Sequence, residues 1–276
     1  KNLLEIDNSK ISKILAPYNL VKTMRAGILV LGPLLARFNY ATVSFPGGCL
    51  IGSRPIDIHL QALAKLGVSY KFIKGYVHAT APNGLIGAKI SFKKISVGAT
   101  ENLIIAASRA TGETILSNCA IEPEIQDLIN FLNKMGCKIK WVGRRKIKIL
   151  GVKRFKKTNY SIMFDRIEAG TMLIAGALIK GNLNIYKIDP KIIKTEINVL
   201  KKIGIKIKVW NNRVKVIGGE KINSINISTA PYPGFPTDLQ AQMMVLLCKA
   251  NKNSKIKEKI FENRFMHVPE LNRMGA

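Results

Sequence analysis

The sequence contains few of the residues that usually build metal sites or disulfides. Among its 276 residues are four cysteines and three histidines. No two cysteines form a CxxC pair, and His59, His78 and His267 lie far apart in the chain. No metal-ligand spacing is present, so we expect neither a metal ion nor a cofactor. Without a signal peptide, the free thiols favour a reducing, cytoplasmic location.

Long apolar runs are also missing. The longest, residues 26–36, has 11 residues and contains glycine and proline, whereas a membrane span needs roughly 20. We therefore expect no membrane partner. The hydrophobic content of 47% is ample for a buried core in one large domain or two of ordinary size.

Acidic residues are scarce: 17 Asp and Glu stand against 44 Lys and Arg, for a net charge of +27. Such a balance raises nucleic acid as a partner. The lysines, however, are scattered and often alternate with isoleucine, as in KIKI (146–149) and KIKV (206–209). This alternation is typical of a strand with one buried and one solvated face. We therefore prefer a solvated, lysine-rich surface to a nucleic-acid site.

A helical phrase that ends in glycine recurs four times: LQALAKLG (60–67), LINFLNKMG (128–136), INVLKKIG (197–204) and PELNRMG (269–275). The final glycines are 69, 68 and 71 residues apart. Each is suited to a left-handed cap at the end of a helix. Two alternating segments around a polar turn follow the first three phrases, which predicts hairpins.

A second helix and a strand are expected before each phrase. Their predicted ranges are 21–38 and 41–45, 97–110 and 113–117, 167–179 and 182–186, and 239–250 and 255–261. The repeating unit is therefore helix, strand, helix, strand, strand. Modules of this kind, packed around shared helices, predict a globular α/β fold.

One cysteine, Cys49, lies in a loop instead of a core pattern. In SFPGGCLIGSRP (44–55) two glycines precede it, and Arg54 follows five residues later. The arginine would stabilise a thiolate, and the glycines would let the loop bend over a ligand. We interpret Cys49 as a nucleophile or an acid. The other three cysteines fit small buried hydrophobes: Cys119, Cys137 and Cys248.

Polar residues recur where the repeated helices begin. Arg25 precedes the first long apolar helix, and KISVG (94–98), FDRIEAG (164–170) and PGFPTD (233–238) lead into the next three. Open backbone N–H groups at a helix start, with an arginine nearby, can bind phosphate oxygens. A plain N-cap explains Ser96 or Asp238 equally well.

These segments together resemble a known family. PYNLVKTMRAG, SFPGGCLIGSRPIDIHL, KKISVGAT, EPEI, DRIEAGT, TAPYPGFPTDLQAQ and FENRFMHVPELNRMGA resemble, in order and spacing, the bacterial UDP-N-acetylglucosamine 1-carboxyvinyltransferases, which are enolpyruvyl transferases. That family has six βαβαββ units arranged as a two-domain inside-out α/β barrel. The resemblance implies this α/β fold with about four of the six units, a first domain over 1–163 and a second over 164–276.

The resemblance also implies the reaction. The 3′-hydroxyl of UDP-N-acetylglucosamine adds to C2 of phosphoenolpyruvate, C3 takes a proton, and phosphate leaves, which is the first committed step of peptidoglycan synthesis. The expected partners are these two substrates, with no nucleic acid. Family segments that would lie before Lys1 and after Ala276 contribute to the phosphoenolpyruvate site. We therefore expect a fragment lacking both ends that is weakly active or inactive alone.

Individual roles follow from the same resemblance. Cys49 matches the family's general acid at C3, which is also the site of covalent adducts with phosphoenolpyruvate and fosfomycin. Asp238 matches the aspartate at the sugar 3′-hydroxyl, the expected base. Arg54 matches an arginine on the phosphoenolpyruvate phosphate, and Arg25 matches another anion-site arginine. The implied substrate contacts are Arg25, Arg54, Pro55, Ile56, Asp57, Ile58, Lys94, Ile95, Ser96, Val97, Asp238 and Ile260.

Three alternatives remain. The sister enzyme of the shikimate pathway has the same fold but lacks the PGGC loop. A basic RNA-binding repeat protein would need aromatic or arginine clusters on one surface, whereas aromatic residues make up only 7% of this chain. A non-catalytic remnant of the transferase is disfavoured because Cys49, Arg54 and Asp238 are intact.

Overall fold

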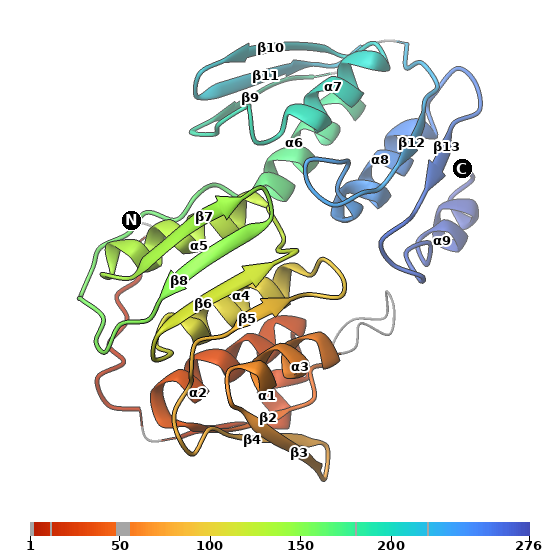
Figure 1. Cartoon of the computed structure of the whole chain (residues 1–276). Helices are drawn as coiled ribbons and strands as arrows, with labels where there is room; N and C mark the ends of the chain where they lie inside the picture. The colour runs from red at the N-terminus through yellow and green to blue at the C-terminus, as the bar shows by residue number, and fades with distance from the viewer. Residues whose placement is uncertain (1–2, 12, 48–55, 180, 220) are drawn as a thin grey trace. The chain divides into compact units, whose positions relative to one another are not determined.

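The computed structural model describes residues 3–11, 13–47, 56–179, 181–219 and 221–276 (Figure 1). The chain forms two compact units, of which the first ends at Tyr160 and the second begins at Ser161. Each unit has a hydrophobic core of its own. The expected domain border after residue 163 stays a prediction.

Two four-stranded sheets build the first unit. One has the order β1-β2-β4-β3, from β1 (Leu15–Ala16), β2 (Tyr40–Ser44), β3 (Ser69–Ile73) and β4 (Tyr76–Thr80). Its helical segments are α1 (Tyr18–Val21), η1 (Arg25–Val30), α2 (Leu31–Phe38) and α3 (Asp57–Lys65). The other has the order β5-β6-β8-β7, from β5 (Lys89–Ser91), β6 (Glu113–Ser117), β7 (Lys138–Gly143) and β8 (Lys146–Leu150), with helices α4 (Val97–Ala107) and α5 (Pro123–Lys134).

The second unit holds a three-stranded and a two-stranded sheet. The larger sheet has the order β10-β11-β9, from β9 (Asn182–Tyr186), β10 (Lys206–Trp210) and β11 (Arg213–Ile217), with α6 (Arg166–Leu178) and α7 (Lys194–Lys202). The smaller pairs β12 (Asn226–Ser228) with β13 (Lys255–Lys257) in parallel. The remaining segments are η2 (Thr237–Leu239), α8 (Gln240–Leu247) and α9 (Val268–Arg273).

The structure confirms the repeat. The run β5, α4, β6, α5, β7, β8 is one complete βαβαββ unit. In it the first two strands pair in parallel and the last two form a hairpin. The four glycines that end the recurring phrase are in the left-handed region, with φ of 91° at Gly67, 103° at Gly136, 96° at Gly204 and 88° at Gly275. A side chain would be strained at these caps, which is why glycine recurs there.

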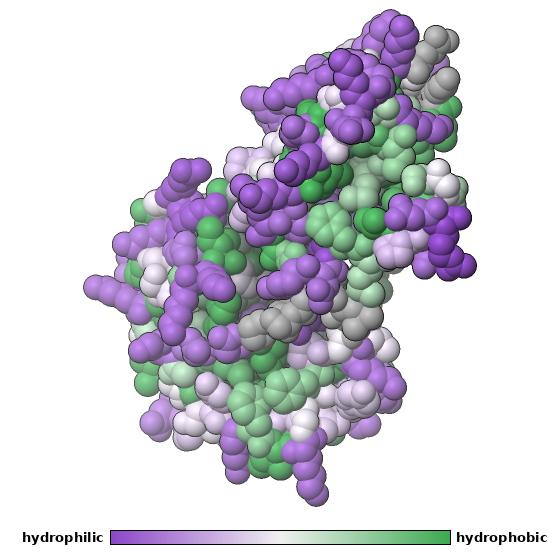
Figure 2. Space-filling view, turned by 90° about the vertical axis from the view of Figure 1, so that its right-hand side faces the viewer, coloured by the Kyte–Doolittle hydropathy of each residue, from purple (hydrophilic) through white to green (hydrophobic). Residues whose placement is uncertain are grey.

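The alternating lysines also lie as predicted. In β8 and β10, Ile147 and Ile207 are buried while the neighbouring lysines face outward. Figure 2 shows hydrophilic side chains over much of the surface of both units. Within the described residues, no helix is long and apolar enough to cross a membrane.

Three local predictions were wrong. The helix expected over 21–38 is three pieces, α1, η1 and α2; Pro33 lacks the N–H that an unbroken helix needs at that point, and Met24 is extended (φ −145°). The strand expected over 255–261 ends at Lys257, because the next carboxylate binds the following backbone amides. Cys119 and Cys137 are buried, but Cys248 is exposed because it caps the C-terminus of α8.

Candidate active site

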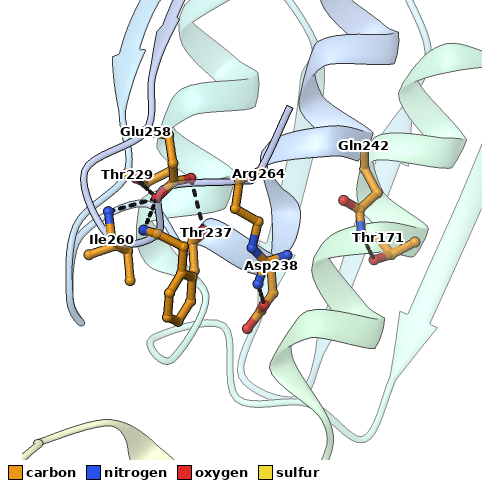
Figure 3. Close-up of polar contacts among 9 residues, drawn as sticks. Thr171, Thr229, Thr237, Asp238, Gln242, Glu258, Ile260 and Arg264 are labelled. Atoms are coloured by element: carbon orange, nitrogen blue, oxygen red, sulfur yellow. Dashed lines mark hydrogen bonds and ion pairs between the residues drawn. The ribbon is translucent and has the colours of Figure 1, made fainter. Parts of the chain in front are cut away.

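The carboxylate of Glu258 organises one edge of the second unit (Figure 3). Glu258 and Thr229 directly follow the parallel strands β13 and β12, so they lie side by side at the carboxyl ends of this pair. Glu258 Oε1 accepts hydrogen bonds from the Thr229 hydroxyl at 2.8 Å and the Ile260 N–H at 2.7 Å. The Phe261 N–H donates to the same oxygen at 3.2 Å, and the Thr237 hydroxyl donates to Oε2 at 2.8 Å.

These contacts fix the charge state of Glu258. Burial by itself would raise its pKa, but the hydrogen bonds from Ile260, Thr229, Thr237 and Phe261 outweigh burial and hold the pKa below its ordinary value. An ionised carboxylate accepts stronger hydrogen bonds than a neutral one. Glu258 is therefore a charged anchor that sets the backbone path through Ile260.

Asp238 lies in η2, close to this anchor, and forms an ion pair with Arg264 (Figure 3). Arg264 Nη2 donates to Asp238 Oδ1. The Arg264 side chain is 20% exposed and its guanidinium lies 5.3 Å from the centroid of the Phe261 ring, whereas the Asp238 side chain is 52% exposed. The Asp238 carboxylate is therefore open to solvent, and its orientation is fixed by the largely buried Arg264.

Asp238 is not a helix cap. The N-cap of η2 is Pro236 and that of α8 is Leu239, and neither has a side-chain capping bond. Ser96, in contrast, is an N-cap, because its hydroxyl accepts from the Ala99 N–H at 3.2 Å. The capping interpretation is therefore right for Ser96 and wrong for Asp238.

In the first unit, three of the expected substrate contacts are the first residues of their elements. Arg25 begins η1, Asp57 begins α3 and Val97 begins α4. Ile56 is buried before α3, while Lys94 and Ile95 are exposed before α4. Helix α3 has no side-chain cap, so its first backbone N–H groups can meet an anion.

Buried contacts of Asn102 and His59 connect helix α4 with η1 and α3. Asn102, fully buried in α4, donates to the Ile28 carbonyl at 3.2 Å and accepts from the Gly32 N–H at 2.7 Å. Its amide nitrogen lies 3.1 Å from His59 Nδ1. Burial, assisted by the positive charge of Arg25 and opposed by Asp57, lowers the pKa of His59 to about 4. The imidazole is therefore neutral at pH 7 and serves as a buried partner for the amide.

Three predicted site residues, Cys49, Arg54 and Pro55, lie outside the described residues. Gly47, the last described residue before them, lies against Lys22 in the segment before Arg25. A Cβ at Gly47 would come within 2.5 Å of the Lys22 carbonyl oxygen, so only glycine fits this approach.

Sequence reasoning missed Glu258, Arg264, Asn102 and His59. Two of them carried a visible signal: Glu258 interrupts the lysine–isoleucine alternation of KIKEKI (255–260), and Asn102 is a polar residue inside the apolar helix α4. Over the described part of the chain, no group of three or more His, Cys, Asp or Glu side chains could hold a metal ion.

Comparison with solved structures defines the class of fold. The chain is similar to the enolpyruvyl transferase NikO from Streptomyces tendae, with a TM-score of 0.82 and 22% identity over 94% of this chain and 62% of that one. It is also similar to EPSP synthase from Acinetobacter baumannii, with a TM-score of 0.61 and 16% identity over 85% of this chain and 55% of that one. The expected enolpyruvyl transferase fold is confirmed.

The chain belongs to the EPSP synthase (3-phosphoshikimate 1-carboxyvinyltransferase) family, whose sequence model matches residues 1–276. It is 70% identical over its full length to a UDP-N-acetylglucosamine 1-carboxyvinyltransferase of Pelagibacter ubique (strain HTCC1062), covering 66% of that protein. It is 50% identical to the enzyme of that name from Coxiella burnetii (strain RSA 493 / Nine Mile phase I), over 99% of this chain and 63% of the relative. The chain thus spans slightly less than two thirds of the length of these relatives.

Proposed function

We propose that this chain carries the base and much of the substrate site for transfer of the enolpyruvyl group of phosphoenolpyruvate to the 3′-hydroxyl of UDP-N-acetylglucosamine. Relatives of that name are 70% and 50% identical across the chain. The observation that carries the proposal is the Asp238–Arg264 pair. It is a half-exposed carboxylate with a fixed orientation, and no helix cap explains it.

Asp238 is the proposed base. Its free oxygen accepts the proton of the 3′-hydroxyl while that hydroxyl oxygen attacks C2 of phosphoenolpyruvate. Arg264 orients the carboxylate, and Glu258 holds the strand end from which Ile260 contacts the nucleotide sugar. A base of this kind must be within hydrogen-bond reach of the proton that it takes.

The first unit supplies the proposed acid and the anion contacts. Cys49 gives its proton to C3, which completes a tetrahedral intermediate, and loss of phosphate with return of a proton from C3 yields the enolpyruvyl product. Arg54 and Arg25 would hold phosphate and carboxylate oxygens, since a guanidinium matches both in a bidentate geometry. The starts of α3 and α4 would hold the diphosphate.

Two matched aspartates test the base. Asp238→Asn, in a chain completed to the length of its relatives, should lower kcat about 10²- to 10⁴-fold in a phosphate-release assay, with product formation checked by mass spectrometry. Asp189→Asn is the control, because Asp189 is exposed, lies outside the family motifs and accepts a local hydrogen bond from the Lys191 N–H at 2.9 Å, which asparagine also accepts. A kcat for Asp238→Asn within threefold of the control would exclude Asp238 as the base.

A second test concerns this chain alone. Residues 1–276 without further sequence should release phosphate weakly or not at all, because the family places further phosphoenolpyruvate contacts in segments outside this range. Normal turnover by residues 1–276 would refute that expectation.

A further inference from the structure

The outward face of the sheet β10-β11-β9 combines aromatic and cationic side chains. Helices α6 and α7 pack against this sheet, and the apolar side chains of alternate residues, among them Val214 and Val216, are buried beneath it. The remaining residues of the three strands face outward in three cross-strand rows. The nine outward residues, here called the β9–β11 face, are Asn182, Asn184, Tyr186, Lys206, Lys208, Trp210, Arg213, Lys215 and Ile217.

The first row of this face is an arginine between two aromatic rings. Arg213 on the central strand is paired in register with Trp210 on one side and Tyr186 on the other. Its guanidinium lies 3.9 Å from the Trp210 ring centroid and 5.7 Å from that of Tyr186. Trp210 is 40% exposed and Tyr186 is 59% exposed. The row therefore combines one cationic and two aromatic side chains, and both rings are partly exposed to solvent.

The next two rows add positive charge. Lys208 pairs with Lys215, and Lys206 lies one row further along β10. With Arg213 the face carries four cationic side chains, and none of its nine residues is acidic. The corresponding sheet of the first unit differs, because there Lys148 is neutralised by an ion pair with Glu113.

We propose that the β9–β11 face binds single-stranded nucleic acid without sequence preference, in addition to the proposed transferase function. Bases stack on aromatic rings and on arginine planes, and lysines bind the phosphates. Successive rows are two residues apart along a strand, or roughly 7 Å, on the scale of one extended nucleotide. This departs from the expectation of no nucleic-acid partner, which rested on scattered lysines that alternate with isoleucine and on an aromatic content of only 7%.

An anionic membrane fits the face less well. Insertion into a headgroup layer needs an apolar projection, whereas Trp210 and Tyr186 both flank the charged Arg213 and the turn between β10 and β11 is Asn211–Asn212. We therefore treat membrane binding as an outcome that the experiment must separate from the proposal.

The first measurement is fluorescence anisotropy of a labelled uridine 12-mer titrated with the full 276-residue chain. The expected Kd is about 1–100 µM at physiological salt. Trp210→Leu and Tyr186→Leu should each weaken binding about five- to a hundredfold through lost stacking, with little change in the salt dependence. Arg213→Lys keeps the charge and removes the planar guanidinium, so it should also weaken binding. Circular dichroism shows whether each variant is folded.

The second measurement isolates the phosphate contacts. The double variant Lys208→Gln with Lys215→Gln should make the negative slope of log K against log salt concentration shallower by about 1.4. Each lost phosphate contact contributes about 0.7 to the steepness of this slope for a single strand. Lys138→Gln with Lys140→Gln removes the same charge from the first unit's hairpin and should leave the slope unchanged. Equal effects of the two double variants would show diffuse charge attraction and overturn the proposal.

Tryptophan fluorescence tests whether the 12-mer contacts the Trp210 ring. The chain has two tryptophans, so Trp141→Phe leaves Trp210 as the single reporter, and its fluorescence should be quenched by the 12-mer. Vesicles of phosphatidylglycerol should neither quench it nor displace the 12-mer. Absence of binding by the parent chain, absence of quenching, or displacement by the vesicles would each overturn the proposal.

Discussion

Replacing Glu258 by glutamine tests whether this carboxylate anchors the edge of the candidate site. The side chain accepts four hydrogen bonds, from two hydroxyls and two backbone N–H groups. Glutamine has nearly the same shape and keeps one acceptor oxygen, but it is neutral. Its second terminal atom is an NH₂ group, which meets the Thr237 hydroxyl as a donor instead of an acceptor. The substitution therefore removes charge without opening a cavity.

The expected magnitude follows from these four contacts. A hydrogen bond to a charged group contributes about 1.5–3 kcal/mol, whereas a neutral one contributes about 0.5–1.5 kcal/mol. The difference is about 1 kcal/mol for each contact, and partial exposure of Glu258 reduces it. We expect Glu258→Gln to lower the free energy of unfolding by about 2 kcal/mol.

The assay is urea unfolding of the Trp141→Phe background, in which Trp210 reports on the second unit. Since the pKa of Glu258 is lowered in the folded state, its stabilisation is fully present above its ordinary value of 4.5 and is lost as the pH falls below that value. The parent should therefore lose more stability than Glu258→Gln when the pH falls from 6 to 3. The variant should have the flatter pH profile.

Glu262→Gln is the matched control, because Glu262 is exposed and lies on the same segment. It removes an identical charge and should change the unfolding free energy by less than about 0.5 kcal/mol. If Glu258→Gln and Glu262→Gln gave equal stabilities and equal pH profiles, the anchoring role of Glu258 would be refuted.

Further predictions concern the first unit and the thiols. Gly32→Ala should destabilise the chain by about 2 kcal/mol or more, measured by thermal unfolding, because a Cβ there would come within 2.2 Å of Asn102 Oδ1. Gly98→Ala meets its nearest atom only at 3.4 Å and should be neutral or stabilising; equal destabilisation by both would contradict the Asn102 contact. Among the described thiols, Cys248 should react with a disulfide reagent at pH 8 and Cys119 should not, since burial raises the pKa of Cys119 to about 12. Rapid labelling of native Cys119 would contradict its burial.

The repeat was predictable because its signals are local. Two of these signals each depend on only a few neighbouring residues. One is a glycine that must adopt a positive φ, and the other is a lysine–isoleucine alternation with one buried face. Three of the strands that follow the repeated helices could therefore be located closely, and β6 and β9 have the bounds that the pattern predicted. The break in the first helix was missed because the pattern of apolar residues continues through Pro33.

The partners of the candidate base were not predictable in the same way. Asp238 and Arg264 are 26 residues apart in sequence, and the parallel pairing of β12 with β13 brings their segments together. Locally, an aspartate after Thr237 at the start of a helix indicates a cap. In the structure Asp238 instead pairs with Arg264, which follows strand β13. No sequence pattern around Asp238 indicates this partner.

The four repeated helices begin in two different ways, and this difference matches the positions of two proposed site residues. In the second and third copies an ordinary cap begins the helix, by Ser96 before α4 and Asp165 before α6. In the first and fourth copies a 3₁₀ turn without a side-chain cap begins it instead, and these turns carry Arg25 and Asp238. A capping side chain is committed to the backbone of its own helix, whereas neither Arg25 nor Asp238 caps the turn that carries it. The two copies that depart from the repeat are therefore the two that supply the proposed base, Asp238, and the proposed anion-site arginine, Arg25.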